Sequence, residues 1–88
     1  MSIQVTSRQV GDVSVVDVAG RITLGEGASA LRETIRGLVA KGQRKILLNL
    51  GEVSYIDSSG IGELVSGFTT VANNGGALKL LNLTKRVQ

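Results

Sequence analysis

One short segment of the chain gathers hydroxyl and carboxylate side chains ahead of a stretch with helical periodicity. It reads Asp57-Ser58-Ser59-Gly60-Ile61-Gly62. Asp and Ser side chains in such a place cap the free N–H groups of a helix, and those groups carry the positive end of the helix dipole. The segment therefore predicts a helix cap with room for an anion such as a phosphate. Its two glycines keep bulk away from an approaching partner.

Nucleophilic catalysis by these serines is not indicated. The chain has no His and no Cys, and a catalytic serine needs a neighbouring base. Lysine can serve as that base, but no Ser–Lys spacing stands out. The same composition excludes disulfides and thiolate zinc sites, and no pair of carboxylates has a spacing that suggests acid–base work. We expect no enzyme, no resident metal and no cofactor.

Two other features have ordinary explanations. Gly25-Glu26-Gly27 lacks the remaining glycines and the Lys-Ser/Thr pair of a phosphate-binding loop, so it predicts a flexible loop. The net charge of +3 suggests a nucleic-acid binder, but the basic residues are scattered and only two aromatic residues are available for stacking on bases. We expect a mildly basic solvated surface and no nucleic-acid partner.

The length of 88 residues fits one domain spanning residues 1–88. A hydrophobic fraction of 42% is enough for a core built from aliphatic side chains. The N-terminus lacks the basic and apolar regions of a signal peptide, and no apolar run approaches the ~20 residues of a membrane span. We expect a cytoplasmic protein with no membrane insertion.

The first elements read as strands. A short strand around Ile3 and Val5 is followed by a hairpin turn at Gly11-Asp12. A β-branched segment over residues 13–19 predicts the second strand, with Gly20 ending it. The run at residues 45–50 is nearly continuously apolar and predicts a strand covered on both faces, with a brief extended segment at residues 53–56 after it.

Helices alternate with these strands. Apolar residues at helical spacing predict a first helix that stops at Lys41-Gly42 and a second that ends at residues 73–76. Residues 77–83 read as a final strand, and residues 84–88 begin another helix. The order β-β-α-β-α-β predicts an α/β fold with a mixed, mostly parallel four-stranded sheet and helices packed on it. The apolar positions are Ala28, Leu31, Ile35, Leu38 and Val39 in the first helix and Ile61, Leu64, Val65, Phe68, Val71 and Ala72 in the second.

Several segments together resemble the STAS-domain anti-sigma factor antagonists, also called anti-anti-sigma factors. Residues 56–62 are similar to the signature of that family, and residues 46–53 to the apolar strand that precedes it. Residues 74–84 are similar to its late turn and strand, and residues 18–22 to the end of its early strand. The resemblance covers essentially the whole chain.

The resemblance implies a regulatory cycle in bacterial transcription. In this family, an anti-sigma factor that is itself a serine kinase binds the unphosphorylated antagonist and releases its sigma factor. The kinase phosphorylates the serine directly after the Asp, which here is Ser58, and a phosphatase resets the switch. By the same resemblance, Asp57, Ser58, Ser59, Gly60, Ile61 and Gly62 form the partner-binding segment.

This chain departs from the family pattern in three places. Thr23 stands in a region where relatives often carry Asp, which affects recognition by the kinase, and Lys85 stands where Pro is common. Family domains also continue through another helix, so we expect the C-terminal helix to be missing or cut short, with self-association through the uncovered surface. Three other STAS roles remain open: an accessory subunit of a lipid-transport ATPase complex, a nucleotide-binding module, and a scaffold of a stress-sensing assembly.

Overall fold

The computed structural model describes residues 3–81, in which four strands alternate with two helices in the expected order. The strands are β1 (Ile3–Val10), β2 (Val13–Ile22), β3 (Lys45–Ile56) and β4 (Ala77–Leu81), and the helices are α1 (Glu26–Ala40) and α2 (Ser58–Asn73). Neither helix is long and apolar enough to cross a membrane within that range.

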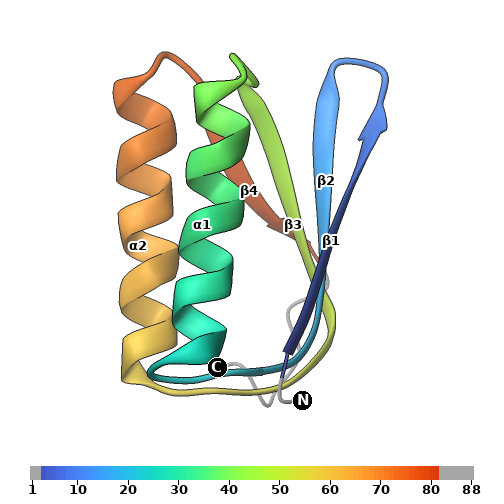
Figure 1. Cartoon of the computed structure of the whole chain (residues 1–88). Helices are drawn as coiled ribbons and strands as arrows, with labels where there is room; N and C mark the ends of the chain where they lie inside the picture. Colours follow the sequence, from blue (N-terminus) through green and yellow to red (C-terminus); the bar gives the residue numbers. More distant parts are fainter. Residues whose placement is uncertain (1–2, 82–88) are drawn as a thin grey trace.

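The four strands form one sheet in the order β1-β2-β3-β4. β1 and β2 form an antiparallel hairpin, whereas β2, β3 and β4 run parallel. Parallel neighbours require crossover connections, and the two helices supply them. Both helices pack on the same face of the sheet, with α1 against β1 and β2 and α2 against β3 and β4 (Figure 1). The α/β fold with a mixed, mostly parallel sheet is confirmed.

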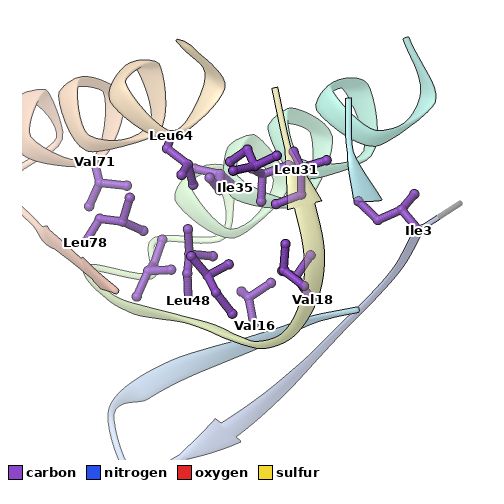
Figure 2. Packing of buried hydrophobic residues seen from close by; sticks show 14 residues of the cluster. Ile3, Val16, Val18, Leu31, Ile35, Leu48, Leu64, Val71 and Leu78 are labelled. Atoms are coloured by element: carbon purple, nitrogen blue, oxygen red, sulfur yellow. The ribbon is translucent and has the colours of Figure 1, made fainter. Parts of the chain in front are cut away.

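Aliphatic side chains between the helix layer and the sheet make the core. Figure 2 shows Leu31, Ile35 and Leu64 reaching from the helices toward Val16 and Leu48 on the sheet. Leu48 lies on the central strand β3 and is completely buried. The core depends on this one interface between two layers.

The strands are longer than the sequence pattern predicts. β1 runs to Val10 rather than stopping near Val5, and β2 continues past Gly20 to Ile22. Gly20 has a φ of 102° and stands at an irregularity in the pairing with β3, so this glycine bends the strand instead of ending it. β3 is likewise one strand of 12 residues, because pairing with β2 continues through the segment after Gly51. Of the final strand, residues 77–81 are confirmed, and the predicted remainder, with the helix start at residues 84–88, lies outside the described range.

The expectation that β3 is covered on both faces is wrong. Both described helices lie on one face, and on the other face Leu47 and Asn49 are only half-buried. On that open face, polar side chains link neighbouring strands. Asp17 accepts hydrogen bonds from the Arg8 guanidinium at 2.8 Å and from the Asn49 amide at 2.9 Å. The apolar run of β3 therefore reflects its central place in the sheet, not a second helix layer among residues 3–81.

The core makes a direct prediction about stability. Replacing Leu48→Ala should lower the free energy of unfolding by about 2–5 kcal/mol, because the cavity would open where the two layers meet. The matched control is Leu24→Ala at an exposed position, which should change it by less than about 0.5 kcal/mol. Urea denaturation followed by circular dichroism measures both, and equal losses in the two variants would contradict this account of the core.

Candidate functional site: the start of helix α2

The starts of both helices meet at one edge of the molecule. α1 follows the carboxyl end of β2 and α2 follows the carboxyl end of β3, so the two connections lie side by side (Figure 1). The last residues of the two strands, Ile22 and Ile56, are paired in register. The Asp57 N–H donates to the Ile22 carbonyl at 3.2 Å, which carries the sheet pairing one residue further.

The Asp57 side chain makes hydrogen bonds to both strand-to-helix connections. One carboxylate oxygen, Oδ1, accepts the Gly60 N–H at 2.9 Å, which makes Asp57 the N-cap of α2. The other oxygen, Oδ2, accepts the Leu24 N–H at 3.1 Å, in the loop that leads into α1. One carboxylate therefore fixes the start of α2 and the approach to α1 at the same time.

These contacts also explain the electrostatics of the cap. The N–H donors of Gly60 and then Leu24 hold the pKa of the Asp57 carboxyl below its usual range, because hydrogen bonds to the charged form favour it. Asp57 is therefore ionised at neutral pH. Of the N–H groups at the start of α2, that of Gly60 is taken by this carboxylate and is not available to an anion.

Ser58 is the first residue of α2 and is exposed, whereas Ser59 is half-buried. The cap is made by Asp57 alone, not by the serines. No side chain among residues 3–81 holds the Ser58 hydroxyl at hydrogen-bonding distance, so nothing in that range acts as a base on it. The Ser58 hydroxyl is therefore accessible and is not activated by a neighbouring side chain within that range.

The two glycines of the segment differ in their surroundings. Gly60 is buried, and a Cβ there would lie 2.5 Å from the Ile22 carbonyl oxygen and 2.7 Å from Ile56 Cγ1. Gly62 is exposed, and a Cβ there would meet nothing within 4 Å. Gly60 thus lets α2 start directly against the end of β2, while Gly62 leaves the surface beside Ser58 open.

The predicted core stripe of α2 is partly wrong. Leu64 and Val71 are buried together with Gly60 and Gly67, which completes an inward face of period 3.6. Ala72 is exposed, and so are three larger apolar residues of the predicted stripe: Ile61 is 48% exposed, Val65 59% and Phe68 38%. Ile61, Val65 and Phe68 form a second, outward stripe that begins beside Ser58. We call these three residues the α2 outer stripe.

Sequence patterns missed several contributors to this site. Leu24 is 79% exposed and donates its N–H to Asp57. The guanidinium carbon of Arg21 lies 5.0 Å from the centre of the Tyr55 ring. The loop predicted at residues 25–27 is also wrong, because Glu26 and Gly27 already belong to α1. The buried position of Gly27, whose Cβ would lie 2.6 Å from the Arg21 carbonyl oxygen, shows why a glycine is needed there.

Metal chemistry has no support in this part of the chain. No group of three or more acidic, His or Cys side chains comes together among the described residues 3–81. The polar groups of the site are instead a carboxylate already held by backbone donors and an exposed hydroxyl.

Comparison with known proteins places this geometry in a family. Residues 4–88 match the family model of the STAS domain. The chain belongs to the STAS domain family. It is 38% identical over 87 residues to the anti-sigma-B factor antagonist of Bacillus subtilis (strain 168), covering 99% of this chain and 78% of that protein. The resemblance seen in the sequence is therefore confirmed.

Solved structures share the STAS fold of this chain. The anti-sigma factor antagonist SpoIIAA in its unphosphorylated form matches with a TM-score of 0.77 at 22% identity, over 92% of this chain and 74% of that one. The Bacillus cell fate determinant SpoIIAA in the phosphorylated form also gives 0.77, at 21% identity over 93% and 75%. A structure of Mglu matches at 0.80 and 25% identity over 94% of this chain, but the chain spans only 20% of that protein. The same fold thus also occurs as one part of a much longer protein.

The two glycines make a matched pair of predictions. Gly60→Ala should destabilise the STAS domain by about 1–3 kcal/mol, because the new methyl group meets backbone that cannot move aside. Gly62→Ala should stabilise it by about 0.5–1 kcal/mol, because it removes a glycine from an open helical position. Thermal or urea unfolding of the two variants checks this, and changes of the same sign would contradict the proposed packing of α2 on β2.

The Asp57 cap predicts a pH dependence. The folded-state pKa of Asp57 lies below its unfolded value of about 3.9, so the ionised cap stabilises the fold fully above about pH 5 and loses this effect as the pH falls through the lowered value. The difference in unfolding free energy between wild type and Asp57→Asn should therefore be largest at neutral pH and shrink toward about pH 3. A difference that stays constant over this range in urea titrations would show that the charge of Asp57 plays no part.

Proposed function

We propose that this STAS domain is an anti-sigma factor antagonist that is switched off by phosphorylation of Ser58. The observation that carries the proposal is an exposed serine at the first position of a helix whose cap is already filled by Asp57. In its unphosphorylated form the protein binds an anti-sigma factor and frees the sigma factor. The anti-sigma factor is also the serine kinase that modifies Ser58, and a phosphatase restores the binding form.

The accessibility of Ser58 supports this role. The residue is exposed, and no side chain among residues 3–81 covers its hydroxyl with a hydrogen bond. Gly62, one turn along, places no side chain over the approach. A kinase can therefore reach the hydroxyl without unfolding the domain.

The charge of Asp57 explains how a phosphate would act. Phosphorylation adds about −1.5 to −2 charges at pH 7, and here it would add them next to a carboxylate whose low pKa keeps it ionised. In a packed interface this charge would be repelled by Asp57 and would lose its hydration. A change of only ~1.4 kcal/mol lowers affinity tenfold, so the modification can disengage the partner while the fold stays intact.

The α2 outer stripe supplies the apolar part of a binding surface. Ile61, Val65 and Phe68 follow Ser58 along one side of α2, and Leu24 stands exposed on the loop that Asp57 holds. Exposed apolar residues that are grouped in this way favour contact with another protein. The partner-binding segment Asp57–Gly62 then forms one end of a larger surface, and the phosphate would enter at its edge.

Two relatives agree with this proposal. The relative with 38% identity is named an anti-sigma-B factor antagonist, and SpoIIAA is known in an unphosphorylated and a phosphorylated form. We carry both properties to this chain because its exposed serine stands beside the capping Asp, as the regulatory cycle requires. The exchange would take place in the cytoplasm, where sigma factors act.

The test uses the purified chain and the serine-kinase anti-sigma factors encoded in its own genome. Incubation with ATP and one such kinase should add a single phosphate, which mass spectrometry locates on Ser58. Ser58→Ala should bind that kinase without being modified, and Ser58→Asp should bind at least about tenfold more weakly, because it places a negative charge at the edge of the surface.

Ser7→Ala is the matched control. This serine is exposed on β1 and lies outside the partner-binding segment, so its loss should leave both phosphorylation and binding close to wild type. An unmodified Ser58 with every kinase, or equal binding by Ser58→Asp and wild type, would overturn the proposal. Co-purification with a transporter ATPase instead of a kinase would point to the accessory-subunit role.

A further inference from the structure

Arg21 and Tyr55 form an exposed pair at the same edge of the sheet as Ser58. They are partners in the register between β2 and β3, one position before the Ile22 and Ile56 pair that leads into the site. The guanidinium carbon of Arg21 lies 5.0 Å from the centre of the Tyr55 ring, within the range of a cation–π contact. Tyr55 is nevertheless 45% exposed, so the pair faces solvent.

The pair is connected to the Asp57 site through the backbone. Arg21 directly precedes Ile22, whose carbonyl accepts the Asp57 N–H, and Tyr55 stands two residues before Asp57. Because side chains alternate along a strand, Arg21 and Tyr55 point to the face of the sheet opposite the buried Ile22 and Ile56. The pair therefore flanks the edge that carries Ser58 from the side of the sheet away from the helices.

The guanidinium of Arg21 still has unused hydrogen-bonding capacity. Stacking uses the flat face of the group and leaves its N–H donors at the edge free to grip a carboxylate. Within residues 3–81 no carboxylate lies at ion-pair distance from Arg21, and the nearby Asp57 carboxylate is already held by Gly60 and Leu24. The Tyr55 ring also limits the movement of the Arg21 side chain, so less freedom is lost when a partner binds.

We propose that Arg21, held on Tyr55, is a specificity-determining contact that binds an acidic side chain of the partner protein. This inference rests on the proposed function and names the chemistry of the partner at that site: a carboxylate opposite Arg21, on a partner that spans the edge of the sheet from Ser58. Arg and Tyr are enriched among the residues that dominate protein interfaces. A partner protein with a basic residue opposite Arg21 binds more weakly, because the two positive charges repel each other.

The experiment measures binding to the kinase that modifies Ser58, by calorimetry at low and high salt. Arg21→Glu should weaken binding at least about tenfold, because it sets two carboxylates against each other. Arg21→Lys should weaken it by a smaller factor, since lysine keeps the charge but loses the fork of donors. Arg21→Glu should also show a weaker salt dependence than wild type, because the attraction between opposite charges is lost, whereas Arg21→Lys keeps the charge and should keep the salt dependence. Lys41→Glu is the control, with the same charge change at the opposite end of α1 from the site, and should bind as wild type does.

A charge exchange identifies the partner's residue. Replacing one acidic residue of the kinase with Arg should restore the binding of Arg21→Glu and weaken that of the wild-type chain. Binding by Arg21→Glu that equals or exceeds that of wild type would overturn the inference, provided that thermal unfolding shows an intact fold. If Ser58→Asp still blocks binding in that case, the proposed function stands and only the role of Arg21 fails. If no kinase modifies Ser58, the proposed function fails before any Arg21 variant is made.

Discussion

The two hydrogen bonds accepted by the Asp57 carboxylate are the constraint on which the site depends. Through Gly60 N–H and Leu24 N–H, this one side chain holds the start of α2 and the loop before α1 against the ends of two paired strands. The backbone donors keep the carboxylate ionised, and the ionised carboxylate keeps the loop in place. Ser58 follows this cap directly as the first residue of α2, and its side chain is exposed.

Small residues make this arrangement sterically possible. Gly60 and Gly27 let the two helices begin where a Cβ would collide with the end of β2. Gly67 continues the same inward face of α2, which it shares with Leu64 and Val71, while the α2 outer stripe lies on the exposed side. α2 therefore packs closely on one side and presents an apolar surface on the other.

The sequence was sufficient for the order of elements and for the position at which α2 begins. Period-3.6 spacing identified both helices, and the Asp-Ser-Ser-Gly turn identified the start of α2. The sequence did not predict the outward stripe, because both adjacent faces of α2 carry apolar residues and an apolar pattern does not distinguish the buried face. Gly60 and Gly67 lie on the buried face but have no side chain, so they add nothing to a hydrophobic pattern. The Arg21–Tyr55 contact and the Leu24 bond escaped notice because they join residues 33 or 34 positions apart, which only the strand register brings together.

The central claim is that phosphorylation of Ser58 changes the charge of a fixed surface without rearranging the fold. Backbone amide NMR spectra of the unmodified and the phosphorylated STAS domain test it most directly. The account predicts shifts confined to the α2 start, the loop before α1 and the adjacent strand ends, with the amides of Gly60 and Leu24 still hydrogen-bonded. Shifts that extend through the β1–β2 hairpin and β4, or loss of the Gly60 and Leu24 bonds, would contradict it.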